Sequence, residues 1–253
     1  MPFPLAPELD YLCFANPSWF ARLALGFSPD PHQERVLTAQ HPRRALCCSR
    51  QWGKSTLAAI LAVHRFVYGP PGNTSVIVAP ALRQSRELLR KMRSFVRTLG
   101  FRPRTDGDNP HSLMLPNASR VVAVPARDAT TRGFSSVSLL ILDEAARIPD
   151  FVYYSFRPML AVSGGDLLAL STPAGERGFF FEACRDASDL WQPHSVPASE
   201  CPRIPQSFLD EERRAISDWW FRQEYCCEFV PLSEGLFPRR ALDSLFVEDS
   251  EPV

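Results

Sequence analysis

A phosphate-binding loop is the first chemistry that the residue types suggest. The segment 47–56, CCSRQWGKST, carries the Gly53-Lys54-Ser55 core of the G-x-x-x-x-G-K-[ST] motif, with Cys48 where the first glycine would be. An apolar run that predicts a strand precedes it, and a helical pattern over 55–68 follows. In that setting the helix N-terminus attracts a phosphate, lysine reaches the β- and γ-phosphates, and the serine hydroxyl can ligate Mg²⁺. A helix start after an ordinary loop is the alternative, but the strand–loop–helix context favours a loop that binds ATP and Mg²⁺.

Arg50 adds a permanent cation to this loop. It could reach a γ-phosphate from within the same subunit, and a solvated loop charge is the alternative. Lysine is rare in the chain, which has 28 basic residues but lysine only at Lys54 and Lys91. The residues expected to bind the nucleotide around this loop are Ser49, Arg50, Gln51, Trp52, Gly53, Lys54, Ser55 and Thr56.

A pair of adjacent carboxylates follows the apolar run 137–142. Asp143 and Glu144 stand where a buried strand ends, and ligands bind at that edge of a doubly wound sheet. Asp143 would hold Mg²⁺ through water, and Glu144 would orient and polarise an attacking water. A polar end to a buried strand is the alternative. Together with Lys54, the pair predicts a site for nucleotide hydrolysis, in an ATPase with an added strand and a catalytic glutamate.

Strands that alternate with helices must position these residues. Apolar runs predict strands at 44–49, 74–79, 137–142 and 166–170, and helical periodicity covers 55–68 and 82–99. Residues 112–115 and 120–125 flank a Pro-Asn turn and predict a hairpin. The pattern predicts an α/β fold with a mostly parallel sheet flanked by helices. We divide the chain into an N-terminal extension (1–30), a P-loop ATPase core (31–204) and a helical linker subdomain with a tail (205–253). The pattern over 205–229 is long and mostly helical.

Composition and charge exclude several classes of protein. The chain has 28 basic and 28 acidic residues, so its net charge does not indicate a nucleic-acid partner. Its apolar runs are shorter than the ~20 residues of a membrane span, and no secretory signal is apparent. Seven cysteines without CxxC spacing are typical of reduced thiols. The Arg-rich stretch 82–97 could grip phosphates, but we favour a solvated helix face for its basic residues, Arg83, Arg86, Arg90, Lys91, Arg93 and Arg97.

Four motifs, in order, resemble the large terminase subunits that package DNA in tailed bacteriophages. They are SRQWGKS (49–55), LILDEA (140–145), LSTP (170–173) and FRQEYCCEF (221–229), and the resemblance extends from about residue 28 to 240. It implies a P-loop NTPase fold of the ASCE type. It also implies an ATP-driven motor that moves viral DNA into a procapsid.

The resemblance assigns further roles. Gln33, in Pro31-His32-Gln33, would read the adenine edge, and Ser171 and Thr172 would sense the γ-phosphate and couple it to DNA movement. Arg132 would be an arginine finger supplied by a neighbouring subunit, with Arg50 and Arg127 as the other candidates. An ordinary helix-start residue and a strand-end turn are the alternatives for Gln33 and for 171–172.

Partners and location follow only from the resemblance. It implies double-stranded DNA, a homo-oligomeric ring when active, a portal and a small terminase subunit, no membrane, and work in the cytoplasm of the infected bacterial host. The family's nuclease domain would begin about where residue 253 lies, so DNA cleavage is not expected of this chain. Two other functions stay open: a helicase-like nucleic-acid-dependent ATPase, and an assembly switch that binds ATP with little turnover.

Overall fold

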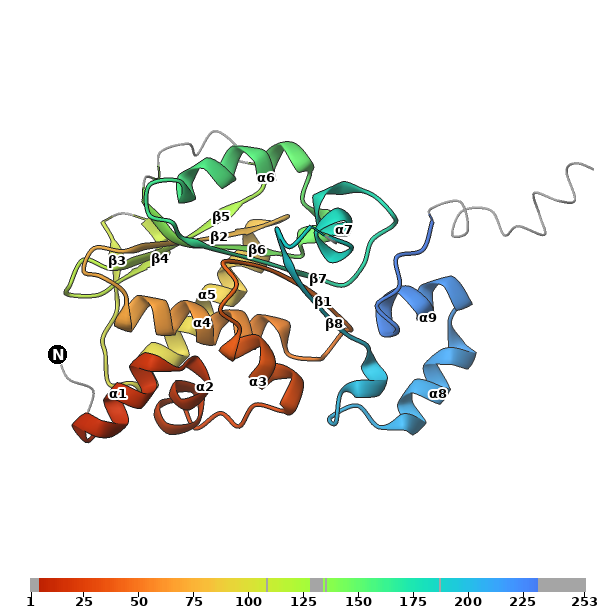
Figure 1. Cartoon of the computed structure of the whole chain (residues 1–253), viewed down its shortest axis with the longest axis horizontal. Coiled ribbons are helices and arrows are strands. Elements are labelled where there is room, and N and C mark those ends of the chain that lie inside the picture. Colours follow the sequence, from red (N-terminus) through yellow and green to blue (C-terminus); the bar gives the residue numbers. More distant parts are fainter. Residues whose placement is uncertain (1–4, 108, 128–133, 135, 187, 232–253) are drawn as a thin grey trace, which may run out of the picture.

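A single mostly parallel sheet forms the centre of the molecule (Figure 1). The computed structural model describes residues 5–107, 109–127, 134, 136–186 and 188–231. Within these residues eight strands have the order β3-β4-β5-β2-β6-β7-β1-β8. Their bounds are β1 Arg43–Cys48, β2 Thr74–Ala79, β3 Arg104–Asp106, β4 Asn109–Met114, β5 Arg120–Pro125, β6 Val137–Asp143, β7 Asp166–Ser171 and β8 Gln192–Val196. The strands from β5 to β8 in this order are parallel, and β3 and β4 extend the sheet as antiparallel strands.

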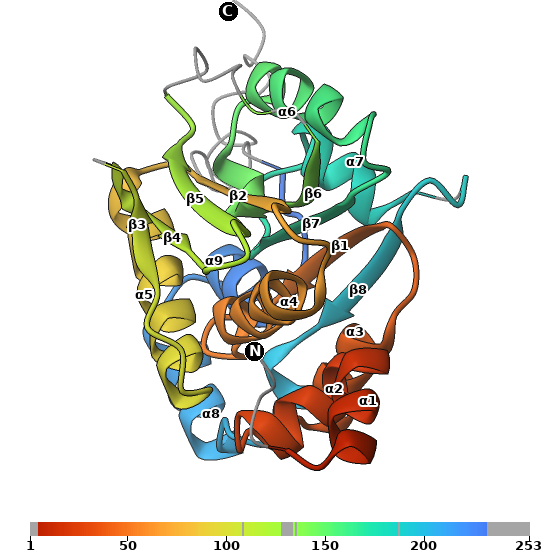
Figure 2. The ribbon, with the colours of Figure 1, turned by 90° about the vertical axis from the view of Figure 1, so that its left-hand side faces the viewer.

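Helices cover both faces of this sheet, which explains why its central strands are apolar throughout. Every residue of β2 and of β6 is buried. One face packs against α3 (Pro31–Thr38), α4 (Lys54–Tyr68) and α5 (Leu82–Thr98), and the other packs against α6 (Asp150–Phe156) and α7 (Gly178–Cys184) (Figures 1 and 2). The predicted α/β fold class is confirmed, and so are the helices over 55–68 and 82–99 and the hairpin, which forms between β4 and β5.

The N-terminal residues form short helices beside α4. These are α1 (Pro7–Ala15), α2 (Pro17–Trp19) and a π-helical turn, Phe20–Ala24. Phe20 is fully buried against the ring of His64 on α4, whose Nε2 also lies 2.9 Å from the carbonyl of Cys13. None of the helices that the structure describes is both long and apolar enough to span a bilayer. All seven cysteines lie in the described residues and are free thiols, as predicted.

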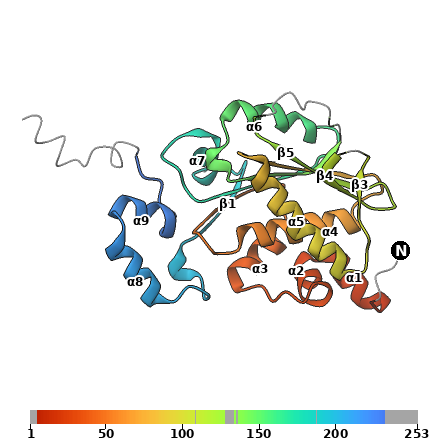
Figure 3. The same ribbon diagram turned by 180° about the vertical axis from the view of Figure 1, so that it is seen from behind.

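The C-terminal part, predicted to be mostly helical over 205–229, is divided into separate helices. It contains two helices, α8 (Gln206–Ala215) and α9 (Asp218–Tyr225), at the end of the molecule opposite α1 (Figure 3). Ile216 is extended (φ −118°, ψ 162°) and breaks the helix, and Cys227 (φ 60°) adopts a left-handed conformation after α9. Local backbone conformation therefore overrides the helical pattern at both places. The division of the chain at residues 30 and 204 remains a prediction.

Candidate nucleotide-binding site

Three strands bring the predicted site residues to one edge of the sheet. β7 lies between β6 and β1, so one strand separates the carboxylates from the loop. The strands are in register: Asp143 pairs with Leu170, and Leu170 pairs with Leu46. Because all three strands are parallel, the loop after β1, the pair Asp143–Glu144 and the residues after β7 emerge at the same edge. β7 is the added strand that the sequence predicts between the loop and the carboxylates.

The loop after β1 contains two residues in the left-handed conformation. Cys48 belongs to β1, and the left-handed residues of the loop are Gln51 (φ 62°) and Gly53 (φ 105°). Lys54 is buried, and its Nζ donates hydrogen bonds to the carbonyls of Cys48 (3.0 Å) and Ser49 (2.9 Å). The carbonyls at the start of the loop thus hold the ammonium in place.

Trp52 fixes the loop to the core of the protein. Its side chain is fully buried in the core, and its backbone carbonyl accepts hydrogen bonds from Gln33 Nε2 (3.1 Å) and Arg203 Nη2 (2.6 Å). A Cβ at Gly53 would lie 3.0 Å from that same Nε2, which is a tight contact, and the positive φ of this residue favours glycine. Gln33 Oε1 accepts from the backbone N–H of Asp30 (3.1 Å), so both ends of the amide are engaged. Its reading of adenine remains a prediction.

Two backbone N–H groups of the loop are held by distant segments. Ser49 N donates to Val196 O on β8 (3.0 Å), and Arg50 N donates to Glu224 O on α9 (3.2 Å). Ser49 is fully buried, and its hydroxyl has no partner among the described residues. The N–H groups of the first two loop residues are therefore already satisfied, and those nearer Lys54 are the ones that can face a phosphate.

Asp143 and Glu144 occupy different environments. Asp143 is buried, and burial together with the neighbouring Glu144 carboxylate raises its pKa to about 6, against the opposing charge of Lys54. Glu144 has a left-handed backbone (φ 54°), and its N–H donates to Asp143 Oδ1 (3.2 Å). Glu144 Oε2 lies 2.8 Å from Arg147 Nη1 and accepts from Ser171 Oγ (3.3 Å).

The residues present fit one Mg²⁺ ion that also binds phosphate oxygens. Ser55, in the first turn of α4, offers a hydroxyl, and Asp143 offers a carboxylate that carries a desolvation cost and would gain from a cation. No cluster of three or more His, Cys, Asp or Glu side chains in the described residues could hold a metal alone. Mg²⁺ commonly binds through one or two protein groups plus phosphates and water, which matches this donor set.

Three residues of the site were missed by the sequence analysis. Arg147, four residues after Asp143, contacts Glu144 and also donates from Nη1 to Thr172 Oγ1 (3.2 Å). Glu224 and Arg203 reach the loop from the C-terminal part. Arg147 could have been found from the sequence, because it lies only three residues after Glu144. Arg203 gives no local signal, because its contact with the loop crosses 151 residues of sequence. Glu224 lies in the FRQEYCCEF motif, but that motif does not reveal its partner Arg50, which is 174 residues away.

The three arginines that are candidates for the arginine finger differ in their positions in the structure. Arg132 lies outside the described residues, Arg127 is exposed just after β5, and Arg50 is 60% exposed with its Nε on Glu224. Thr56 accepts from Lys91 Nζ (3.4 Å), which brings the second lysine of the chain beside the loop helix. On α5, Arg83, Arg86 and Arg90 are exposed, and Arg90 pairs with Glu87. These positions are those expected of a solvated helix face.

Comparison with known proteins identifies relatives. No protein-family model matches the chain. It is 30% identical over 251 residues to the large terminase subunit of Thermus phage G20c, a match that covers 84% of the chain and 51% of that protein. The large terminase subunit of Escherichia phage T5 is 25% identical, over 92% of the chain and 57% of that protein. The chain spans about half the length of the curated relatives it matches.

Solved structures agree with this. A mutant ATPase domain of the Thermus phage P74-26 large terminase superimposes with a TM-score of 0.76 and 25% identity, over 85% of the chain and 100% of the domain. The large terminase of a thermophilic bacteriophage, solved in complex with ADP, shares the fold, with a TM-score of 0.66 and 13% identity over 80% of the chain and 54% of that protein. The chain is therefore homologous to the large terminase subunits of phages, over the portion that forms their ATPase domain.

Proposed function

We propose that this chain is the ATP-hydrolysing motor portion of a phage large terminase and that it drives viral DNA into a procapsid. The observation that supports the proposal most is the shared edge of β1, β7 and β6. It gathers the buried Lys54, the adjacent carboxylates and Thr172 within one site. The homology to large terminase ATPase domains gives the site its biological setting.

Each residue of the site has a separate task in this proposal. Lys54 exchanges its two carbonyl partners for the β- and γ-phosphates of ATP. Ser55 and Asp143 would hold Mg²⁺, which would supply positive charge beside the phosphates. Glu144 orients a water molecule in line with the γ-phosphate and accepts its proton. Thr172 lies within the same hydrogen-bonded group as Glu144, through Arg147, and so can respond to loss of the γ-phosphate.

The partners in this proposal come from the family. Double-stranded DNA is the transported polymer, identical subunits form a ring when the motor is active, and a portal and a small terminase subunit complete the assembly. The place of work is the cytoplasm of the infected bacterium. Nuclease activity is not proposed for this chain.

Steady-state ATP hydrolysis and ATP binding by Lys54→Ala and Glu144→Gln test the proposal. Lys54→Ala should abolish turnover and weaken ATP binding, because no other ammonium occupies the loop. Glu144→Gln should keep ATP binding but lose turnover by a factor of about 10²–10⁴, as expected when a general base is removed. Glu182→Gln, on the exposed side of α7, is the matched control and should behave as wild type.

The outcomes separate the candidate functions. Near-wild-type turnover in Lys54→Ala would exclude the site as the seat of hydrolysis. ATP binding with zero turnover in both the wild type and Glu144→Gln would favour an assembly switch. If Glu144→Gln lost ATP affinity as severely as Lys54→Ala, the division of tasks between Asp143 and Glu144 would be wrong.

A further inference from the structure

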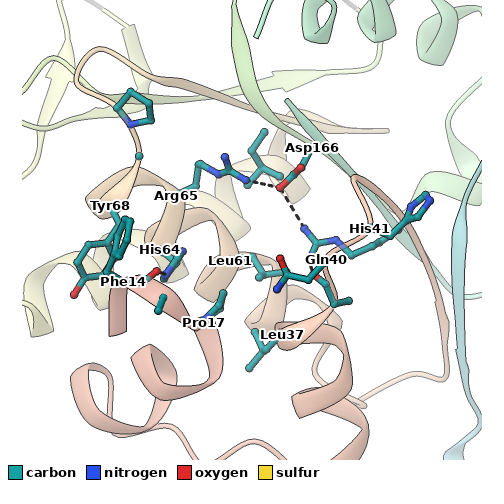
Figure 4. Close-up of a pocket in the computed structure, with 16 residues that line it drawn as sticks. Phe14, Pro17, Leu37, Gln40, His41, Leu61, His64, Arg65, Tyr68 and Asp166 are labelled. Atoms are coloured by element: carbon teal, nitrogen blue, oxygen red, sulfur yellow. Dashed lines mark hydrogen bonds and ion pairs between the residues drawn. The ribbon is translucent and has the colours of Figure 1, made fainter. Parts of the chain in front are cut away.

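A cavity of about 390 Å³ lies at the edge of the sheet opposite the nucleotide site (Figure 4). Its walls come from the N-terminal helices α1 and α2, the end of α3, the last two turns of α4 and the first residues of β1 and β7. A cavity of this size is within the range that holds small organic ligands. None of the residues in its walls takes part in the nucleotide site.

Arg44, in the wall of this cavity, is a buried cation whose described contacts are all long. The residue is 4% exposed, and its Nη1 lies 3.5 Å from the carbonyls of both Val36 and Ala39. Its Nη2 lies 3.7 Å from Asp166 Oδ2, and its Nε has no partner among the described residues. Good N–H···O hydrogen bonds are no longer than about 3.2 Å. The fold thus leaves a buried guanidinium short of acceptors, which is unfavourable for a charged group.

Arg65 adds a second guanidinium beside the first. It lies in the last turn of α4, is partly buried and pairs with Asp166. Asp166 is therefore shared by two arginines, and these three side chains together carry one net positive charge. Burial lowers the pKa of His64, another residue of the wall, so its imidazole is neutral at pH 7. One further carboxylate would balance the charge and supply the acceptor that Arg44 lacks.

The charge of the cavity favours a monoanion over a dianion. A phosphate dianion would exceed the single positive charge of the two arginines and Asp166. The free carbonyls in the last turn of α4 would repel it further, because the C-terminal end of a helix carries partial negative charge. A carboxylate meets less of this repulsion and matches the planar geometry of a guanidinium.

The part of the wall away from the ion pairs is apolar. Leu37 and Leu61 are buried, and Figure 4 shows them below the ion pair of α4 and β7. Phe14 and Tyr68 add two aromatic rings whose centroids lie 5.9 Å apart. The Tyr68 hydroxyl donates to Asp10 on α1 (2.7 Å), so the tyrosine offers the cavity its ring rather than its hydroxyl. A ligand that fits would therefore be charged at one end and apolar at the other.

We propose that this cavity is a second ligand site, which binds a small monocarboxylic acid with an apolar, ring-bearing body. The carboxylate accepts hydrogen bonds from the guanidinium groups of Arg44 and Arg65. The body packs against Leu37, Leu61 and Phe14. A bound acid would join the N-terminal helices to α4 and to the sheet, at the ends of β1 and β7 that are remote from the phosphate-binding loop.

Titration of phenylbutyrate into the whole chain, followed by calorimetry or ligand-observed NMR, tests the proposal. The Kd should be about 1 mM or lower, as expected of a ligand of this size. Phenylbutanol and phenylbutylamine keep the body and replace the carboxylate. Both should bind at least about tenfold more weakly, the effect of losing one charged hydrogen bond. Inorganic phosphate should not compete, and saturating ADP with Mg²⁺ should leave the Kd of phenylbutyrate unchanged.

Two variants locate the binding. Arg65→Gln should raise the Kd of phenylbutyrate at least about tenfold. Arg97→Gln is its matched control, because Arg97 is an exposed arginine in the last turn of α5. Gln40→Glu adds a carboxylate at an exposed position of the cavity wall, where the fold tolerates it. It should weaken phenylbutyrate binding and leave the melting temperature at or above that of the wild type, because Arg44 gains an acceptor.

Equal binding of the acid, the alcohol and the amine would overturn the proposal, since the cavity would then recognise only the apolar body. Displacement of phenylbutyrate by ADP, or a Kd unchanged in both Arg65→Gln and Gln40→Glu, would also overturn it. The same holds if no saturable binding occurs at tenfold above the expected Kd. If Arg65→Gln does not fold, Gln40→Glu decides alone. None of these measurements depends on ATP turnover, so their failure would leave the proposed function standing.

Discussion

Cys48 shows how a side chain can stand in place of the first glycine of a phosphate-binding loop. It is fully buried as the last residue of β1, and the left-handed conformations fall on Gln51 and Gly53 instead. Burial raises the pKa of its thiol, so the side chain stays protonated and brings no negative charge toward a phosphate. Cys48 is not among the residues with a positive φ, so this position tolerates a side chain where the motif has glycine.

His194, on β8, should make the protein sensitive to acid. Burial, with the nearby cations Arg44 and Arg35, lowers the pKa of His194 to about 4, below the unperturbed value of about 6.5. The unfolded chain therefore binds a proton at higher pH than the folded one. This contribution to the free energy of unfolding is complete above pH ~6.5 and is lost as the pH falls toward ~4.

Urea denaturation of His194→Gln and wild type between pH 7 and pH 4 checks this expectation. The variant should lose less stability over that range, and the difference between the two proteins should narrow or reverse at the acid end. A pH dependence equal to that of the wild type would show that other groups cause the acid sensitivity.

At the scale of elements, an ion-pair cluster joins β1, β7 and α4 at the edge of the sheet opposite the loop. Figure 4 shows Arg65 reaching Asp166 beside a pocket of about 390 Å³. Arg44 is 4% exposed, its Nη2 lies 3.7 Å from Asp166, and its Nε has no partner among the described residues. One carboxylate thus compensates a buried guanidinium at the start of β1 and an arginine in the last turn of α4.

Asp166→Ala should destabilise the fold without affecting nucleotide binding. The loss should be about 2–4 kcal/mol, because it leaves a buried cation unpaired. Thermal or urea unfolding measures the loss, and ATP binding at saturating Mg²⁺ should be unchanged, since the site lies at the other ends of β1 and β7. Asp218→Ala, at an 80% exposed side chain, is the control. A fall in ATP affinity with unchanged stability would contradict this separation of the two edges.

The sequence predicted the elements better than their contacts. The strands β1, β2, β6 and β7 and the helices α4 and α5 could be predicted because periodicity and apolar runs are local signals. The strand β8 was missed, since its sequence QPHSV is mostly polar and it gains its place only by pairing with β1. For the same reason the site could be predicted from Lys54 to Glu144, but Glu224 could not, because its partners are brought together only by folding.

At the scale of the whole molecule, the prediction concerns assembly. If Arg132 acts on the nucleotide of a neighbouring subunit, ATP hydrolysis depends on contact between subunits. An inserted arginine can raise the rate of hydrolysis by a factor of about 10³–10⁵. Arg132→Ala should therefore leave ATP affinity of the monomer unchanged. It should also remove the rise in specific activity that assembly on DNA produces.

Mixing inactive Glu144→Gln and Arg132→Ala subunits gives the decisive measurement. Some interfaces of a head-to-tail ring would then combine an intact Glu144 site with an intact Arg132, so partial ATPase activity should return. No recovery, in mixtures shown to form mixed assemblies, would count against a finger supplied by the neighbour. Arg50 and Arg127 would then be the candidates.

The hydrogen bonds between the loop and the segments β8 and α9 have a consequence for folding during protein synthesis. The N–H groups of Ser49 and Arg50 find their acceptors at Val196 and Glu224, which leave the ribosome long after the loop itself. We therefore expect a nascent chain to hold its loop and Lys54 in an unfinished state through most of translation. ATP can bind the folded loop only after residue 224 has left the ribosome. We therefore expect ATP not to stabilise nascent chains that end before this residue.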